Sequence, residues 1–349
     1  MKLQITRVTP NQIILCTDGK KSLVAEAGML VRHDQGGQTH YLQPSSSVWR
    51  ERVLSRWRLT RQALRLGILN AQLCDDDTIL AVAKGRIMRS VSMDGCLETC
   101  HVLRPGMKPC FNGIAVLPSG VCFCGEYLLN HQRTQVVALL RSKEKSHSFE
   151  RIFEFSPGRV RHIHFVQWDS YDNCLWMGTG DRDEECLLMR TFDLGKSWEI
   201  IGQGSQLWRA TGLVFTKDCL YWAMDAGRDT GTTPSFIVRM DRNTGRTVQL
   251  VELQGPCHSC GQLKDGTLLF STGIEGGVNE KHTCAHIWAS RDGEHWEDLA
   301  YWQKDAWPLR IQYGIIRFPH GLEKSSVLHF TTLGLKGCAE TWHVARIVD

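Results

Sequence analysis

The sequence predicts an all-β protein, a β-propeller with six or seven four-stranded blades. Pairs of apolar strands, each joined by a Gly, Asp or Asn turn, recur about every 50 residues, a period typical of propeller blades. A more polar hairpin follows each pair, with the alternation of outer strands that face water on one side. The 349 residues, 42% of them hydrophobic, can bury one large core. We therefore expect a single domain over residues 1–349.

The apolar pairs define the inner half of each predicted blade. Residues 113–125 and 212–224 share one plan of strand, tight turn, strand and small-residue loop. Their nearly continuous apolar character is typical of strands covered on both faces. The plan returns at 68–84, 164–178, 261–273 and 314–333, and the polar hairpins lie at 136–155, 187–201, 236–253 and 286–299.

The two ends of the chain are expected to form one blade together. The last repeat offers three strands, so we expect a strand from residues 1–16 to join it and close the ring. Such closure removes the open sheet edges that invite aggregation. Residues 68–349 then hold the repeated blades, and residues 17–66 form a partial seventh blade or a decoration.

An eight-residue turn motif supports this assignment. Residues 191–198, TFDLGKSW, match the pattern Ser/Thr-x-Asp-x-Gly-x-Ser/Thr-Trp, and residues 290–296, SRDGEHW, are a shorter version. The Asp is expected to accept hydrogen bonds from the backbone of the turn, the Gly to take a positive φ, and the Trp to cover the turn. Degenerate versions at 92–95 and 240–245 occupy equivalent turns, so the motif spacing agrees with the strand spacing.

This motif is the Asp-box, and over about residues 68–349 the chain resembles the Asp-box (BNR-repeat) sialidase-like β-propellers. The resemblance implies a carbohydrate-active propeller in which the box is structural and faces away from the active centre. A sialidase would also need a Phe/Tyr-Arg-Ile-Pro segment, which this sequence lacks. No catalytic residue of the sialidases is therefore carried over.

Composition excludes several other classes. No run of 18 apolar residues exists that could span a membrane, and the first residues lack a secretory signal, so we expect a cytoplasmic protein. The fourteen scattered cysteines are expected to be mostly buried thiols. The net charge of +4 does not favour nucleic acid as a partner. The arginine-rich stretch 49–65 is interpreted as a solvated strand or short helix, although single-stranded nucleic acid or an acidic polymer would also suit it.

Polar residues recur where the predicted inner strands end, the place where propeller loops build a funnel. We expect His164 to be the general base, Tyr127 or Glu126 the acid, and Arg209 with Arg182 the clamps for an anion. Asp181 joins the catalytic set because it follows a strand directly. The remaining candidates for substrate binding are Asn112, His162, Asp225, His258 and Glu275.

His162 and His164 also suggest a metal. Side chains alternate along a strand with a period of two, so both imidazoles are expected on one face. With His258 from a neighbouring strand they could ligate a divalent cation. The alternative is that one of them faces the axis and the other is a core histidine.

Two functions remain open at this stage. The first is a carbohydrate-active enzyme, a glycoside hydrolase or a lyase, that acts on a sugar bearing a carboxylate or on another small anionic ligand. Paired carboxylates suit hydrolysis, whereas a base beside an arginine suits β-elimination. The second is a non-catalytic propeller scaffold that binds a glycan or a protein. No oligomeric state is predicted.

Overall fold

The computed structural model describes residues 1–42, 53–64, 66–74, 76–83, 85–90, 96–107, 110–143 and 148–349. The chain divides into two compact units. Unit 1 comprises Met1–Val102, Gly261–Ile274 and Thr283–Asp349, and unit 2 comprises Leu103–Cys260 and Glu275–His282. The expected turn at 92–95 lies outside the described residues.

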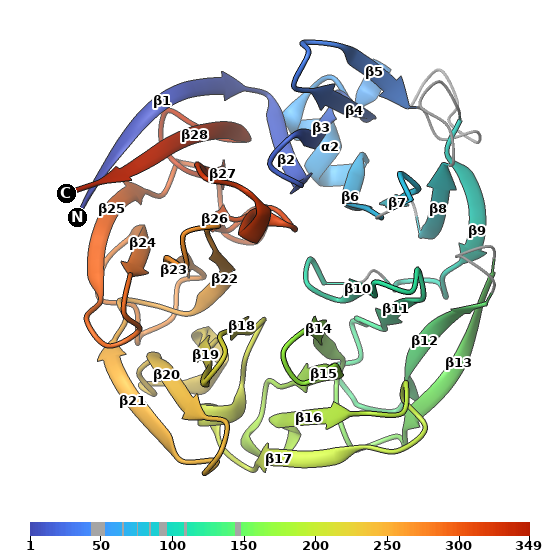
Figure 1. The fold of residues 1–349 in the computed structure, drawn as a ribbon, viewed down its shortest axis with the longest axis vertical. Helices are drawn as coiled ribbons and strands as arrows, with labels where there is room; N and C mark the ends of the chain where they lie inside the picture. Colours follow the sequence, from blue (N-terminus) through green and yellow to red (C-terminus); the bar gives the residue numbers. More distant parts are fainter. Residues whose placement is uncertain are drawn as a thin grey trace. The chain divides into compact units, whose positions relative to one another are not determined.

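Unit 2 contains three antiparallel sheets, each of four strands in sequence order. In Figure 1 the first strands of these sheets lie on one side of the unit and the fourth strands on the opposite side. Backbone hydrogen bonds join the first two sheets, from Val166 N to the Asn112 carbonyl at 2.8 Å and from Ile163 N to the Glu126 carbonyl at 2.9 Å. The strands are β10 (Ile114–Val116), β11 (Cys122–Gly125), β12 (Val137–Lys143), β13 (Ser148–Phe155), β14 (Ile163–Asp169), β15 (Cys174–Thr179), β16 (Leu187–Thr191), β17 (Glu199–Gln203), β18 (Val214–Phe215), β19 (Cys219–Ala223), β20 (Phe236–Asp241) and β21 (Thr247–Glu252).

Unit 1 holds two further four-stranded sheets and one larger sheet. The four-stranded sheets are β2 (Gln12–Thr17), β3 (Lys21–Glu26), β4 (Met29–Asp34) and β5 (Thr39–Leu42), and β6 (Ile68–Leu73), β7 (Ile79–Ala83), β8 (Arg86–Ser90) and β9 (Glu98–Val102). The larger sheet joins β23 (Leu268–Ile274), β24 (Cys284–Ser290) and β25 (Glu297–Gln303) to β26 (Gly314–Arg317), β27 (Leu328–Leu333), β28 (Thr341–Val348) and β1 (Lys2–Pro10). β22 (Cys257–Gln262), which ends in unit 1, pairs with β23.

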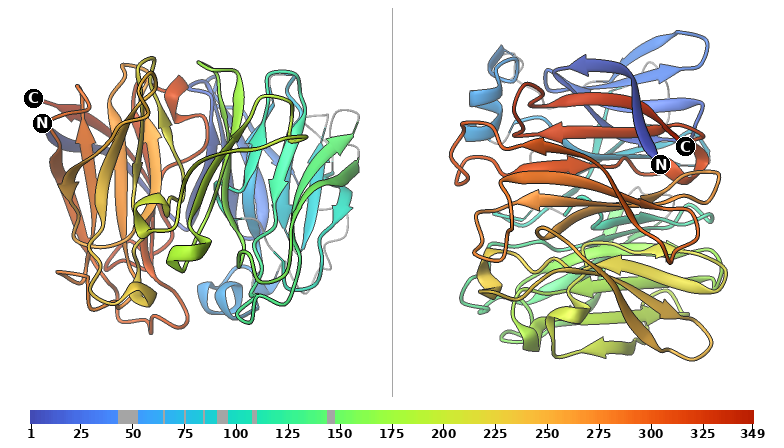
Figure 2. Two further views of the ribbon diagram at one scale, coloured as in Figure 1. Left: turned by 90° about the horizontal axis from the view of Figure 1, so that it is seen from below. Right: turned by 90° about the vertical axis from the view of Figure 1, so that its left-hand side faces the viewer.

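The described strands thus form seven sets of four, which agrees with the predicted propeller class and with the higher of the two blade numbers. β1 pairs with β28 from Lys2 opposite Val348 to Pro10 opposite Thr341. Figure 2 shows the N- and C-termini side by side at the ends of these two strands.

The expected boundaries near the N-terminus differ from the structure in one respect. The strand that joins the last set ends at Pro10, and the next strand, β2, begins a separate sheet. Between them Asn11 has a φ of 60°, a left-handed turn conformation that asparagine tolerates. Residues 12–42 therefore supply a complete set of four strands, followed by the short helix α2 (Arg58–Leu64).

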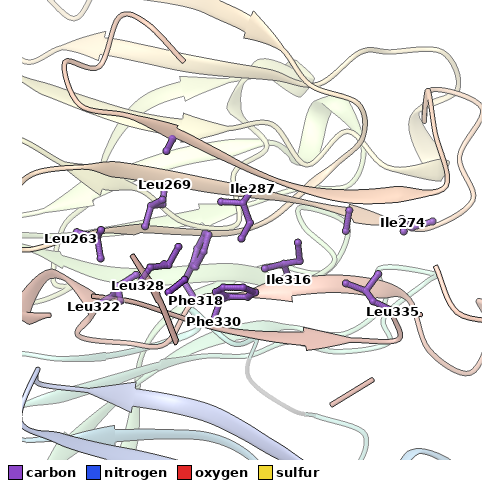
Figure 3. Close-up of a cluster of buried hydrophobic side chains, with 13 residues drawn as sticks. Leu263, Leu269, Ile274, Ile287, Ile316, Phe318, Leu322, Leu328, Phe330 and Leu335 are labelled. Atoms are coloured by element: carbon purple, nitrogen blue, oxygen red, sulfur yellow. The ribbon is translucent and has the colours of Figure 1, made fainter. Parts of the chain in front are cut away.

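Buried aliphatic and aromatic side chains hold each unit together. In unit 1 they come from β23, β24, β26, β27 and the loops between them, as Figure 3 shows for Leu269, Ile287, Ile316 and Phe330. In unit 2 the rings of Trp208 and Trp222 stack with centroids 5.6 Å apart. Each fully buried side chain of this size contributes about 1.5–3 kcal/mol, which makes these clusters the main source of stability.

The hydrogen bonds expected for the turn at 191–198 are present. Asp193 Oδ1 accepts hydrogen bonds from Lys196 N at 3.0 Å and Ser197 N at 2.9 Å. Gly195 has a φ of 90°, and the Trp198 ring lies 5.6 Å from that of Phe153. The equivalent carboxylates at 241 and 292 make the same kind of turn contacts. These turns have a structural role.

Other predictions from composition can also be compared with the structure. All fourteen cysteines lie in the described residues and are free thiols. No helix among the described residues is long and apolar enough to cross a membrane. In the arginine-rich stretch, Arg58 pairs with Asp305 at 2.5 Å and Arg61 pairs with Glu340, so both are internal ion pairs of unit 1. Residues 49–52 and 65 lie outside the described ranges.

Candidate active site

Most of the predicted site residues meet within unit 2, where strands end. β14 carries His164, with His162 just before it, and β15 is followed directly by Gly180 and Asp181. Arg209 precedes β18, Asp225 follows β19, His258 lies in β22, and Glu275 follows β23. All of these residues belong to unit 2.

The first group consists of His162, His164 and Asp181, all buried. The Nε2 atoms of the two histidines are 3.1 Å apart, and each lies 3.5 Å from Asp181 Oδ1. His162 Nδ1 is 3.0 Å from the Leu128 carbonyl, an acceptor, so we place the proton of His162 on Nδ1. His162 Nε2 then accepts a hydrogen bond from His164 Nε2, which leaves His164 Nδ1 unprotonated.

His164 Nδ1 is enclosed and has no hydrogen-bond partner among the described residues. Gly180 lies beside it, and a Cβ at residue 180 would be 3.2 Å from Nδ1 and 2.8 Å from Cε1. The glycine therefore lets the backbone pack closely against this nitrogen, and any side chain at residue 180 would crowd the imidazole. An imidazole nitrogen that carries no proton and has no partner can serve as a base.

Burial and charge fix the protonation states of this group. Burial lowers the pKa of His162, and the nearby Asp181 opposes only part of that effect. Burial alone would raise the pKa of Asp181, but its contacts with His162 and His164 outweigh this effect and hold the pKa well below its usual range. Asp181 is therefore an ionised carboxylate, and the lowered pKa of His162 favours a neutral imidazole beside it.

Tyr127 covers this group. Its ring stacks on His162, with centroids 3.8 Å apart and planes inclined by 16°. Burial raises the pKa of Tyr127 well above its usual value. The residue therefore keeps its hydroxyl proton and can donate it.

Two arginines converge on Asp181. Arg161 Nη1 lies 2.6 Å from Oδ2, and Arg209 Nη2 lies 3.4 Å from Oδ1. Arg209 also reaches Asp225 at 3.4 Å and Asp229 at 3.0 Å, so its guanidinium is surrounded by carboxylates. Burial alone would lower the pKa of Arg209, but these carboxylates raise it above its ordinary value.

A second group lies on the other side of Arg209 and consists of Asp225, His258 and Glu275. His258 Nε2 is 3.2 Å from Glu275 Oε1. Burial raises the pKa of Asp225 to about 7, because Arg209 and His258 offset only part of the effect. Burial opposes the other two shifts, but the mutual contact raises the pKa of His258 and lowers that of Glu275.

Three predicted residues are not in these groups. Glu126 is buried against Arg104 and accepts a hydrogen bond from Ala138 N at 2.8 Å. Its carboxylate is therefore held by contacts outside both groups. The Arg182 side chain is 61% exposed, because Asp181 has a φ of 108° and turns the chain outward.

Asn112 and His258 also depart from the expected arrangement. Asn112 Nδ2 donates to the Thr211 carbonyl at 2.9 Å, a contact between the segments that precede β10 and β18. His258 belongs to the second group, so the three histidines do not form one ligand set. In each group the histidines contact a carboxylate that follows another strand: Asp181 after β15 in the first group and Glu275 after β23 in the second.

Sequence reasoning missed Arg161 and Asp229. Arg161 directly precedes His162, and strict alternation would have pointed it away from the site. It lies before β14 begins, however, so the alternation does not apply to it. Asp229 belongs to a short 3-10 turn, Arg228–Thr230, for which the strand repeats give no signal.

Three groups of His, Cys, Asp and Glu in the described part of the chain bring donor atoms within 4.8 Å of one another. Two are those described above. The third, Asp169, Asp172 and Cys174, already holds the Arg242 guanidinium, which lies 2.6 Å from both carboxylates.

The repeated four-stranded antiparallel sheets define the chain as a β-propeller. No protein-family model matches it, and no curated protein matches it in sequence. An oligogalacturonate lyase in complex with manganese is similar in structure, with a TM-score of 0.61, 14% identity, and 99% of this chain and 93% of that chain covered.

Two further solved structures are similar. An oligogalacturonate lyase from Vibrio parahaemolyticus has a TM-score of 0.58 at 12% identity, with 99% of this chain and 92% of that chain covered. A GH74 enzyme from Niastella koreensis has a TM-score of 0.59 at 13% identity, with 98% of this chain and 55% of that chain covered. At these identities the similarity shows the fold.

Proposed function

We propose that this chain is a carbohydrate-active enzyme that cleaves a uronate-containing glycan by β-elimination at the first group. The observation that carries the proposal is that His164 Nδ1 has no hydrogen-bond partner among the described residues and lies near the Tyr127 ring, which stacks on His162. The similarity to two oligogalacturonate lyases supports this choice over other propeller functions.

The proposed reaction assigns one role to each side chain. His164 Nδ1 removes the proton on C5, next to the uronate carboxylate, and the electron pair forms the C4–C5 double bond as the C4–O bond breaks. Tyr127 donates its proton to the departing oxygen. General acid and base groups of this kind contribute about 10²–10⁴-fold each to the rate.

This step needs a cation beside the substrate carboxylate, to stabilise the negative charge that develops there. Arg161 is the best-placed cation, since its Nε has no hydrogen-bond partner among the described residues and its side chain is partly exposed. Asp181, held by Arg161 and Arg209, stabilises the imidazolium that forms on His164. A divalent cation would supply further positive charge.

Hydrolysis is the second candidate, and the second group favours it. The pKa of Asp225 is raised to about 7, while that of Glu275 is lowered. A protonated and an ionised carboxyl group in one site are the acid and the base or nucleophile of a glycosidase. In that mechanism Asp225 would protonate the leaving oxygen.

One assay separates these functions. The purified chain is incubated with a panel of oligosaccharides containing uronates, and two signals are followed: new reducing ends and the ultraviolet absorbance of an unsaturated uronate. Elimination raises both signals, whereas hydrolysis raises the reducing ends alone. Binding measured by calorimetry without either signal would overturn the enzymatic proposal in favour of the scaffold.

A further inference from the structure

The charged network in unit 2 has more carboxylates than cations. In the protonation states that metal binding requires, with His258 neutral and Asp225 ionised, four carboxylates face two guanidinium groups, a shortfall equal to the charge of one divalent cation. The carboxylates are Asp181, Asp225, Asp229 and Glu275, and the guanidinium groups are Arg161 and Arg209.

Among these carboxylates, Asp225 is the one with a buried oxygen that has no partner in the described part of the chain. The residue is 8% exposed, and its Oδ2 lies 3.4 Å from Arg209 Nε. Its Oδ1 is enclosed and has no hydrogen-bond partner among the described residues. A buried carboxylate oxygen without a partner is costly, and a bound cation removes that cost.

His258 and Glu275 complete a set of donors with Asp225. Each of the three residues offers one donor atom, and these atoms lie within 4.8 Å of one another. Six-coordinate ions with bonds of about 2.1 Å hold adjacent donors about 3 Å apart. The contact of 3.2 Å between His258 Nε2 and Glu275 Oε1 has this spacing, and the Asp225 carboxylate lies close enough to join them on one ion.

The loop that carries Glu275 is held in place by its own hydrogen bonds. Asn279 Nδ2 donates to the Ala226 carbonyl at 2.5 Å and to the Thr233 carbonyl at 2.9 Å. Glu280 Oε1 accepts hydrogen bonds from three successive backbone amides that begin at Glu275. A Cβ at Gly227 would lie 2.4 Å from Glu275 Oε2, so this glycine makes room for the carboxylate.

The carboxylates of the other two groups already have partners. Asp181 is paired with two arginines, and the two histidines beside it bond to each other. The third group holds the Arg242 guanidinium. Only the second group, among those found in the described residues, combines an unpaired carboxylate oxygen with further ligands.

We propose that Asp225, His258 and Glu275 form a binding site for one divalent cation. Two carboxylates and one imidazole are a mainly oxygen ligand set, which suits Mn²⁺ better than the softer metals. The proposal concerns binding and does not depend on the enzymatic activity proposed above.

Calorimetry with Mn²⁺ on the full chain, after removal of metals with a chelator, tests this site. The wild type is expected to bind one Mn²⁺ ion. Loss of a ligand in Glu275→Gln or Asp225→Asn should weaken binding by at least about a hundredfold, the upper end of what outer-shell changes cost. Asp229→Asn is the matched control, because Asp229 touches the same Arg209 but lies outside the donor group.

A second control separates the two histidine groups. His164→Gln should bind Mn²⁺ as the wild type does, and Mn²⁺ should raise the melting temperature of the wild type but not that of Glu275→Gln. Melting with chelator present checks that each variant folds. Should Asp225→Asn fail to fold, His258→Gln, a change at a less buried position, takes its place.

Three results would overturn the proposal. If the wild type binds no Mn²⁺, the group is a histidine–carboxylate ion pair. If His164→Gln loses binding while Glu275→Gln keeps it, the ion belongs to the first group. If Asp229→Asn loses as much affinity as Glu275→Gln, the effect is one of general charge rather than ligation.

Discussion

The Tyr127 ring lies on the His162 imidazole with centroids 3.8 Å apart, so a residue in the loop after β11 covers a residue that directly precedes β14 in the next sheet. This stack excludes water from His162 and thereby helps to keep it neutral. A neutral His162 can accept a hydrogen bond from His164 Nε2, and this contact leaves the other nitrogen of His164 available. The proposed base therefore depends on contacts between two sheets.

Replacing His164 with glutamine should remove the proposed base. We expect kcat to fall about 10²–10⁴-fold, with a smaller effect on KM, because glutamine cannot take up the proton. Steady-state kinetics on the best substrate of the panel measures this. His286→Gln is the control, since His286 is also buried but lies in unit 1. Equal losses in both variants would contradict the assignment.

Replacing Glu126 with glutamine should affect stability rather than catalysis. Glu126 is bound by Arg104 and by Ala138 N, so the change weakens a buried ion pair. We expect the free energy of unfolding to fall by about 1–3 kcal/mol, as measured by urea denaturation, with kcat nearly unchanged. The exposed Glu184→Gln serves as the control. A large loss of kcat in a stable Glu126→Gln protein would return Glu126 to the catalytic set.

A side chain at residue 180 should disturb the base. The Cβ of Gly180→Ala would lie 2.8 Å from His164 Cε1 and 2.8 Å from Arg209 Cγ, so the imidazole must shift. Shifts of about 1 Å in a catalytic group can cost about 10²-fold in rate, and we expect a loss of that order in kcat. The control is Gly36→Ala, where an added Cβ would meet nothing within 4 Å. Wild-type kcat in Gly180→Ala would argue against His164.

Stability of unit 1 should fall in mild acid. Burial lowers the pKa of His343 to about 4, and burial together with the charge of Arg7 lowers that of His329 to about 4, whereas both titrate near 6.5 when unfolded. Their contribution is complete above pH 6.5 and is lost as the pH falls toward 4. Between pH 6.5 and 5 the loss is on the order of 2 kcal/mol per histidine.

Urea unfolding at a series of pH values measures this loss. His343→Gln should have a shallower pH dependence, because one of the two groups that take up a proton on unfolding is gone. A variant with the same dependence as the wild type would contradict the assignment of His343 as a buried neutral imidazole.

Much of the fold follows from the sequence because local patterns decide it. The period of the apolar strand pairs gave the sheets of unit 2, and the turn motif at 191–198 has the hydrogen bonds that its residue types require. The four strands within residues 12–42 were harder to predict from the sequence. The turn at Asn11, which separates them from the preceding strand, lacks the glycine that marks most other turns.

The candidate site was only partly predictable, because side-chain direction depends on details that a repeat does not encode. His162, His164, Asp181 and Arg209 meet as expected from their places at strand ends. Asp181, with its positive φ, turns Arg182 away, and this left-handed conformation has no signal in the sequence. Arg161 contacts Asp181 where Arg182 was expected to lie. Arg161 precedes β14, so the alternation of side chains along that strand does not decide its direction.

The masses of the reaction products test the central claim most directly. Elimination adds no water, so the new non-reducing end should be lighter by one water than the corresponding hydrolysis product. We expect wild-type protein to release such unsaturated fragments from a uronate oligosaccharide, and His164→Gln to release almost none. Fragments that all carry the added water would contradict elimination at His164.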